Sequence, residues 1–344
     1  MQTLRVAING YGRIGRNVLR AWLENGCPAP LDFVAINDLG AAETLAHLTR
    51  YDTTHGRYAG TVALDNDRLT VTTPDGSVNR TLRVFRESQP DALPWAELGV
   101  DVVLECTGQF RARADAARHL RAGAGKVIIG AAPFDEVDAT VVYGVNHHTV
   151  RSEDRVLSSV SCTTHALVPL VKILDEAFGL ESALMTEIHA VTSDQVLLDH
   201  THRDLRRGRA AGHNIIPTTS SSIGALKRVL PQLAGKVDGY SVRVPTLNVA
   251  MIDLSFVARR AVDAAAINAA FRTAADSDYR EILGYCDEWL VSSDFNHSPY
   301  SLIVDATETR VAGKQAKVLA WYDNEWGYAN RLLDLCRVLA GLAK

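Results

Sequence analysis

The chain is poor in cysteine and has no long apolar run. Its five cysteines among 344 residues form an odd number, and none of them are spaced as CxxC. This scarcity disfavours a disulfide framework or a cysteine-rich zinc site and favours reduced thiols in a cytoplasmic compartment. The first residues lack the basic and apolar regions of a secretory signal, and no run approaches the roughly 18 apolar residues of a transmembrane helix. We therefore expect a cytoplasmic protein that has no membrane partner.

Charge of one sign is also scarce. The net charge is −4, with 22% charged and 47% hydrophobic residues, which is ordinary for a globular protein. This balance predicts no nucleic-acid partner, so an anionic substrate would need a local cluster of cations. The histidine pairs His147/His148 and His200/His202 lack a convincing ligand set, and we predict no metal site.

The pattern up to about residue 150 is typical of an α/β domain. The length of 344 residues fits roughly two domains. In the first, short apolar runs alternate with amphipathic segments. The expected strands are Leu4–Ile8, Phe33–Ile36, Val102–Glu105, Lys126–Ile129 and Thr140–Tyr143, and the expected helices are Arg13–Asn25 and Ala114–Ala122. Strands separated by helices predict a parallel, doubly wound sheet.

The pattern changes near Ser161. A helix is expected to run from there through Phe178, and longer strand-like runs follow, including Tyr240–Val244 and the alternating Asn248–Val257. These features predict a second, α+β domain with a mainly antiparallel sheet. An amphipathic helix over Trp326–Leu342 could return to the first domain.

A glycine motif follows the first expected strand. Gly10, Gly12 and Gly15 form GxGxxG at the start of the first expected helix. The first glycine permits the tight turn, the second lets backbone amides approach a pyrophosphate, and the third lets helix and strand pack closely. Asp38 lies 23 residues after Gly15, where a carboxylate can bind the adenosine ribose and repel a 2′-phosphate. This order predicts a Rossmann-type NAD-binding domain, and a glycine-rich turn of an unrelated α/β domain is the alternative.

A candidate nucleophile begins the helix near Ser161. Ser161 is a good N-cap, and Cys162 then lies in the first turn, where the positive end of the helix favours a thiolate. His189 ends the apolar run Ala183–Ile188. If that run is a strand beside the helix, the imidazole can take the proton of the thiol. The alternative is a buried small hydrophobic cysteine and a structural histidine.

Ten segments of the chain resemble the glyceraldehyde-3-phosphate dehydrogenase family. They lie between about residue 5 and residue 335, in the family's order: NGYGRIGR, VAINDL, ECTG, DATVVYGVNHH, SCTT, HAVTSDQ, HRDLRRGRAA, RVPTLNV, SSDFNHSP and WYDNEWGYANR. The resemblance implies an NAD-binding domain over residues 1–161, completed by a C-terminal helix at 324–344, and a catalytic domain over residues 162–323.

The resemblance also implies a reaction. Cys162 attacks an aldehyde, His189 accepts the proton as hydride passes to NAD, and inorganic phosphate cleaves the resulting thioester to an acyl phosphate. The implied partners are an aldose phosphate and inorganic phosphate, and the family's usual assembly is a homotetramer with a role in glycolysis. The close relative erythrose-4-phosphate dehydrogenase, which releases a free acid, is one alternative. A non-catalytic NAD-binding paralogue is another.

Binding residues carry over from the family by position. Two arginines with a hydroxyl suit phosphate, because guanidinium donates two parallel hydrogen bonds. The implied substrate-phosphate site is Thr192, Asp194, Arg207 and Arg243; the implied inorganic-phosphate site is Ser161, Thr163 and Ser220; and the implied cofactor contacts, besides the glycines, are Arg13, Ile14, Asp38, Thr107 and Asn324.

The chain departs from the family pattern near the implied nucleophile. His165 replaces an asparagine, and we interpret it as filling the same space, with an electrostatic effect on Cys162 as the alternative. Glu187 replaces the usual threonine and should share a strand face with His189, so we expect it to raise the pKa of that imidazole. Ser220–Ser222 replaces Thr-Gly-Ala, which retains a hydroxyl but predicts a reshaped phosphate loop.

Overall fold

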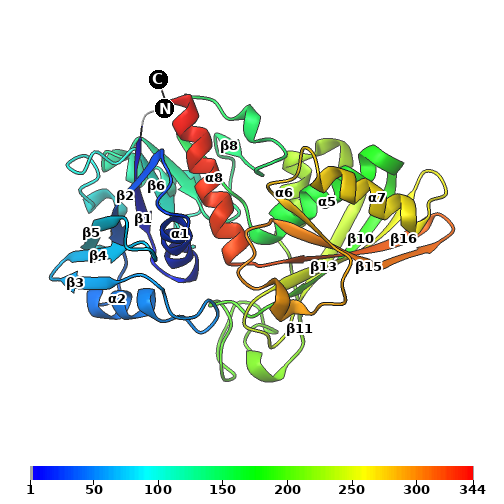
Figure 1. Cartoon of the computed structure of the whole chain (residues 1–344), viewed down its shortest axis with the longest axis horizontal. Coiled ribbons are helices and arrows are strands. Elements are labelled where there is room, and N and C mark those ends of the chain that lie inside the picture. Colours follow the sequence, from blue (N-terminus) through cyan, green and yellow to red (C-terminus); the bar gives the residue numbers. More distant parts are fainter. Residues whose placement is uncertain (1–2, 344) are drawn as a thin grey trace. The chain divides into compact units, whose positions relative to one another are not determined.

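The chain forms two compact units, each around its own sheet (Figure 1). The computed structural model describes residues 3–343. One unit extends to Val160 and includes the residues from Ala329 onward, and the other comprises Ser161–Tyr328. Within the described residues, no helix is both long and apolar enough to cross a membrane.

The first unit is a predominantly parallel sheet with helices. Its strands are β1 (Leu4–Asn9), β2 (Leu31–Asn37), β3 (Val62–Asp65), β4 (Arg68–Thr72), β5 (Asn79–Phe85), β6 (Val102–Glu105), β7 (Lys126–Ile129), β8 (Ala139–Thr140) and β9 (Val156–Ser158), and its helices are α1 (Arg13–Glu24), α2 (Ala42–Arg50), α3 (Arg113–Ala116) and α4 (Arg118–Arg121). The strand order is β3-β4-β5-β2-β1-β6-β7-β9-β8. All neighbours from β5 to β8 in this order are parallel, and β4 and β3 extend the edge in antiparallel fashion.

Burial explains the central strands of this sheet. Strands β6 and β7 are short apolar runs, and every residue of β6 is buried, as expected for parallel strands covered on both faces. Because β1 pairs with β6 so that Asn9 lies opposite Glu105, the glycine turn after β1 and the segment after β6 lie side by side. The predicted doubly wound parallel sheet is confirmed.

Two expected elements of this unit differ from the structure. The strand expected at Thr140–Tyr143 is only β8, which ends at Thr140 after pairing with β9. The helix expected at Ala114–Ala122 is divided at Ala117 into α3 and α4. There the amide of Leu120 bonds to the carbonyl of Ala117, a tighter three-residue spacing that interrupts the α-helical pattern.

The second unit carries a mixed sheet with helices on one face. Its strands are β10 (Leu180–His189), β11 (Ile216–Thr218), β12 (Val237–Arg243), β13 (Ala250–Ala258), β14 (Leu283–Cys286), β15 (Leu302–Ala312) and β16 (Gln315–Tyr322), and its helices are α5 (Cys162–Phe178), α6 (Ser222–Val229) and α7 (Ala264–Ala275). The order is β11-β12-β10-β13-β16-β15-β14. Only the β10/β12 and β14/β15 pairs are parallel within the described residues, so the predicted mainly antiparallel sheet is confirmed.

Alternation sets which face of this sheet is covered. Along β13, buried and partly exposed residues alternate without a break, the period of a strand with one face in the core. Helices α5, α6 and α7 lie over one face (Figure 1). The last helix, α8 (Trp326–Leu342), has the bounds expected from sequence. The Asp323 carboxylate accepts hydrogen bonds from the amides of Glu325 and Trp326 and thereby caps its start.

Candidate functional site

Cys162 is the first residue of helix α5 in the second unit. Ser161 is the N-cap, as predicted, and its Oγ accepts a 3.2 Å hydrogen bond from the amide of Thr164. This cap ties down the backbone just before the thiol. The first turn of a helix leaves amides without intrahelical partners, and such amides can stabilise a developing oxyanion.

His189 lies beside Cys162, as expected if the apolar run before it is a strand next to the helix. The imidazole ends β10, and its Nε2 lies 3.6 Å from the Cys162 Sγ. Its Nδ1 lies 2.7 Å from the carbonyl oxygen of Ala190. Because a carbonyl can only accept, Nδ1 carries the proton and Nε2 presents its lone pair to the thiol. The neutral ring is therefore held in the tautomer that a general base requires.

The protonation state of the pair differs from the expectation. Desolvation, followed by the Glu187 carboxylate, raises the pKa of the Cys162 thiol to about 12. Burial, followed by the Arg243 guanidinium, lowers the pKa of the His189 imidazole to about 4. Glu187 acts on His189 in the expected direction, but burial and Arg243 outweigh it. Both shifts favour a neutral thiol beside a neutral imidazole in the free chain, which opposes the thiolate that the helix end favours.

The sequence interpretation missed the role of Tyr322, the last residue of β16. Its hydroxyl lies 2.8 Å from the Oγ1 of Thr163, and that Oγ1 donates a 2.7 Å hydrogen bond to the Glu187 carboxylate. The tyrosine ring also packs edge-on to His189 at a centroid distance of 6.1 Å. Thr163, expected at an inorganic-phosphate site, is therefore engaged within the protein. The one signal in the sequence was that Tyr322 lies within the segment WYDNEWGYANR.

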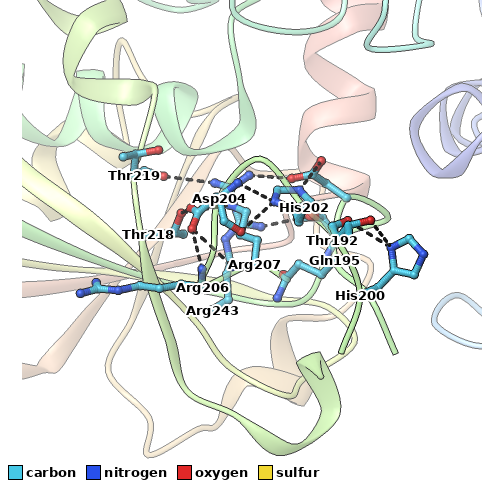
Figure 2. A network of polar contacts seen from close by, with 12 residues as sticks. Thr192, Gln195, His200, His202, Asp204, Arg206, Arg207, Thr218, Thr219 and Arg243 are labelled. Atoms are coloured by element: carbon cyan, nitrogen blue, oxygen red, sulfur yellow. Dashed lines mark hydrogen bonds and ion pairs between the residues drawn. The ribbon is translucent and has the colours of Figure 1, made fainter. Parts of the chain in front are cut away.

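Three residues expected around a substrate phosphate, Thr192, Arg207 and Arg243, lie in one polar network (Figure 2), and Asp194 joins it through its bond to Arg207. Arg243, at the end of β12, is paired with His189 in the sheet register and donates to the Thr192 Oγ1 at 3.2 Å. Arg207 donates to the Asp194 carboxylate at 2.7 Å. The Nε of Arg243 is buried and has no hydrogen-bond partner among the described residues. A guanidinium with a buried, unpaired N–H suits an anionic ligand.

Neighbours that the sequence interpretation did not assign complete this network (Figure 2). The Nε of Arg207 donates to the Thr218 Oγ1 at 2.9 Å, and that hydroxyl donates to Asp204 at 2.6 Å. His202 lies 3.5 Å from the Asp194 carboxylate. These contacts hold Arg207 in place and lower the pKa values of Asp194 and Asp204, so both carboxylates stay ionised beside the arginine.

Ser220, the third residue expected to bind inorganic phosphate, is bonded within its own loop. Its Oγ is 2.7 Å from the Oγ of Ser222, just at the start of α6. Among the described residues, no hydrogen bond joins Ser220 to Ser161 or Thr163. The Ser220 hydroxyl, which was expected to bind phosphate, is hydrogen-bonded to Ser222 of its own loop.

The glycine turn of the first unit has the geometry that its sequence predicted. Gly10 has a φ of +89°, and an added Cβ would lie 2.5 Å from the amide nitrogen of Thr107. A Cβ on Gly15 would lie 2.2 Å from the carbonyl oxygen of Gly10, whereas one on Gly12 would meet no described atom within 4 Å. Gly10 and Gly15 are thus required by the fold, and Gly12 leaves an open approach to the amides that start α1.

The other expected cofactor residues of this unit surround the same turn. The Asp38 carboxylate accepts a 2.7 Å hydrogen bond from the amide of Tyr11, within the turn. Arg13 and Ile14 start α1, and Arg13 forms an ion pair with Asp52. Thr107 follows β6, where its amide donates to the buried Glu105 carboxylate. The turn and its acid are therefore held as one preformed structure.

Asn324 belongs to the second unit and follows β16. The residue is 5% exposed, and its Oδ1 is buried without a hydrogen-bond partner among the described residues. A buried amide oxygen costs free energy unless it is paired. An amide-bearing ligand such as nicotinamide could supply the missing donor. Within residues 3–343, no cluster of three or more histidine, cysteine or acidic side chains is arranged to hold a metal ion.

Gly15, which is crowded, and Gly12, which faces open space, give a matched pair of variants. Gly15→Ala should lower the stability of the free chain by about 1–3 kcal/mol, because the new methyl group overlaps a backbone oxygen. Gly12→Ala should leave stability unchanged and weaken NAD binding by about tenfold or more, because the methyl group would hold a phosphate away from charge-assisted amide contacts. Thermal unfolding without NAD and calorimetric titration with NAD measure the two effects. Unchanged NAD affinity in Gly12→Ala would contradict the assigned approach.

Comparisons with known proteins cover nearly the whole chain. Residues 4–113 match the family model described as glyceraldehyde 3-phosphate dehydrogenase, NAD binding domain, and residues 161–324 match the corresponding C-terminal domain model. Two Cupriavidus necator proteins, the chromosomal and the plasmid glyceraldehyde-3-phosphate dehydrogenase, are each 52% identical over 338 residues, which is 98% of this chain and 99% of theirs. The chain belongs to the glyceraldehyde-3-phosphate dehydrogenase family.

Proposed function

We propose that this chain is a phosphorylating glyceraldehyde-3-phosphate dehydrogenase that uses NAD, with Cys162 as nucleophile and His189 as base. The observation that carries the proposal is the 3.6 Å approach of the Cys162 Sγ to the unprotonated Nε2 of His189. The 52% identity to two relatives of that name over nearly the full chain supports the same reaction. The intact cysteine and histidine argue against a non-catalytic paralogue.

Acylation uses the pair as a proton relay. Nε2 of His189 takes the thiol proton as the Cys162 Sγ bonds to the aldehyde carbon, and it returns a proton to the carbonyl oxygen to give a neutral hemithioacetal. His189 then accepts the hydroxyl proton while the hydride leaves the same carbon, so a thioester to Cys162 remains. Amides at the start of α5 are placed to stabilise the oxygen during both steps.

Deacylation restores the thiol. Inorganic phosphate attacks the thioester carbon, the carbon–sulfur bond breaks, and the acyl phosphate leaves while Cys162 regains a proton from the His189 imidazolium. Ser161, Thr163 and Ser220 are proposed to hold this phosphate, with the hydroxyls of Thr163 and Ser220 exchanging their bonds to Glu187 and Ser222 for the phosphate oxygens. Thr192, Asp194, Arg207 and Arg243 are proposed to hold the phosphate of the substrate, whose oxygens would supply the hydrogen-bond acceptor that the buried Nε of Arg243 lacks.

Each unit carries residues that suit a part of NAD. In the first unit, the open space at Gly12 admits a pyrophosphate to the amides of α1, and Asp38 suits the ribose hydroxyls; in the second unit, the unpaired Oδ1 of Asn324 suits a carboxamide. When bound, NAD accepts the hydride of the aldehyde. Arg13, Ile14 and Thr107 are the remaining proposed contacts, because they start α1 or follow β6.

We further propose that the enzyme is a homotetramer in the cytoplasm. A homotetramer is the assembly usual in this family, and the five free cysteines of the chain favour a reducing, cytoplasmic compartment. Size-exclusion chromatography with light scattering tests the assembly. A monomeric mass at micromolar protein would reject it.

A substrate comparison tests the proposed reaction. NADH formation is measured with glyceraldehyde 3-phosphate, erythrose 4-phosphate and unphosphorylated glyceraldehyde, each with and without inorganic phosphate. We expect turnover that requires inorganic phosphate and prefers the three-carbon phosphate, with a much higher KM for glyceraldehyde because Arg207 and Arg243 lose their ligand. Equal turnover without phosphate, or a preference for the four-carbon sugar, would indicate the acid-forming relative instead.

A further inference from the structure

A buried carboxylate beside the reactive pair has no role in the steps above. Glu187 lies on β10, two residues before His189, and its side chain is only 4% exposed. In the sheet register it lies between Ser241 of β12 and Ile252 of β13, neither of which carries a charge. A carboxylate in such a place is costly unless it is paired or used.

Hydroxyl groups orient this carboxylate. The Oγ1 of Thr163 donates to the Glu187 Oε1 at 2.7 Å and also lies 2.8 Å from the hydroxyl of Tyr322. Because the single hydroxyl hydrogen of Thr163 goes to Glu187, Tyr322 is the donor to Thr163. A directed chain from β16 through α5 therefore ends on Oε1. The second oxygen, Oε2, is buried without a hydrogen-bond partner among the described residues.

The oriented oxygen faces the nitrogen that takes up the proton. Oε1 of Glu187 lies 3.9 Å from Nε2 of His189, and the same Nε2 lies 3.6 Å from the Cys162 Sγ. The Nδ1 of the ring is already committed to the Ala190 carbonyl. When Nε2 gains a proton, the new positive charge is therefore nearest to Glu187 on one side and to the substrate-bearing sulfur on the other.

We propose that Glu187 is a positioning residue that stabilises His189 as an imidazolium during acylation, while it opposes a standing negative charge on Cys162 before the substrate binds. This inference rests on the proposed function, because it acts through the Cys162–His189 pair. It distinguishes this chain from a relative with a neutral threonine at the same place. Because of the Glu187 carboxylate, Cys162 stays a neutral thiol until His189 takes its proton, and the reactive sulfur anion forms only at that step.

The other charges around the pair act in the opposite sense. Arg243 and Arg207 lower the pKa of His189, and Arg243 also lowers that of Cys162, whereas Glu187 raises both and raises the pKa of Tyr322. A substrate phosphate bound to the two arginines would neutralise their charge. The influence of Glu187 on His189 then remains, so the imidazole becomes a stronger base when substrate is present.

Glu187→Gln tests the proposal on the full-length enzyme, because it removes the charge and retains an oxygen that can accept from Thr163. The alkylation rate of Cys162 with iodoacetamide is measured against pH without substrate, and kcat is measured with glyceraldehyde 3-phosphate. We expect the apparent pKa of alkylation to fall by about one unit or more, so that alkylation at neutral pH becomes faster. We expect kcat to fall about tenfold or more, because the imidazolium loses its counter-charge.

This opposite movement of the two rates separates an electrostatic role from a structural one. Damage to the site would slow alkylation and turnover together without moving the alkylation profile, and that result would overturn the proposal, as would an unchanged profile. Glu181→Gln is the matched control, because Glu181 lies on the same strand and is exposed beside Lys314. It should change neither rate.

A second variant and one wild-type measurement complete the test. If Glu187→Gln does not fold, as judged by thermal unfolding and NAD binding, Glu187→Thr is judged by the same two rates. Alkylation of the wild-type enzyme at Cys162 that leaves turnover intact would reject the proposed nucleophile, and this inference with it. A wild-type enzyme that is inactivated, together with an unshifted variant, would reject the role of Glu187 alone.

Discussion

Cys162→Ser is expected to lower kcat for aldehyde oxidation by about 10⁴-fold or more, with little change in NAD affinity. The reaction needs a covalent thioester, and a serine hydroxyl is a far weaker nucleophile than sulfur beside a neutral imidazole. The substitution leaves the Ser161 cap and the start of α5 unchanged, so the fold should be retained. Steady-state NADH formation measures kcat, and calorimetric titration measures NAD binding.

Cys286→Ser is the control for Cys162→Ser. Cys286 ends β14 in the same unit, is buried, and contacts the carbonyl of Glu288 through its sulfur. It tests whether loss of any sulfur from this unit impairs turnover, and we expect kcat to remain near that of the wild type. A Cys162→Ser enzyme that keeps a tenth or more of wild-type kcat would contradict the assigned nucleophile, whatever the control shows.

The parts of the site that could be predicted from sequence are those with local causes. The turn of Gly10, Gly12 and Gly15 depends on backbone conformation and close contacts of the glycines themselves, and the structure shows the positive φ of Gly10 and the close packing at Gly10 and Gly15. Ser161 as a cap and Cys162 as the first helical residue likewise follow from neighbouring residues. These features need no knowledge of how distant segments pack.

Other parts depend on contacts between distant segments. Thr163 and Tyr322 are 159 residues apart, and Thr192 and Arg243 are 51 apart. Nothing local to either segment specifies such a pair, because the register of β10 with β12 and β13, and of β13 with β16, brings them together. The family motifs assigned Thr163, Thr192 and Arg243 to the site but not Tyr322, and only the tertiary packing explains why these residues meet.

The protonation state of Cys162 and His189 also could not be predicted from the local sequence. The sequence correctly placed Cys162 at the positive end of a helix, and that position alone predicts a low pKa. Burial and Glu187 reverse the outcome, and both effects arise from tertiary packing. The charge of a group is set by everything packed around it, so an inference from one helix end could not settle it.

His189→Asn is expected to lower kcat by about 10³-fold, because it removes the base and leaves a side chain that cannot accept the proton. The wild-type imidazole has a pKa lowered to about 4, so it is neutral and competent throughout the neutral range, and wild-type turnover should lose this base only as the pH falls toward that value. The variant has no such base. Its turnover should instead rise steadily with pH as the thiol, whose pKa is raised to about 12, ionises without help.

The pH profile therefore distinguishes loss of a base from loss of structure. His213→Asn, an exposed histidine of the same unit, controls for the change of side chain and should keep both the rate and the flat neutral profile. A His189→Asn enzyme with reduced kcat but the flat profile of the wild type would mean that another group takes the proton. Since Nε2 of His189 is the nitrogen that lies 3.6 Å from the sulfur, that result would require a different nucleophile–base geometry in the working enzyme.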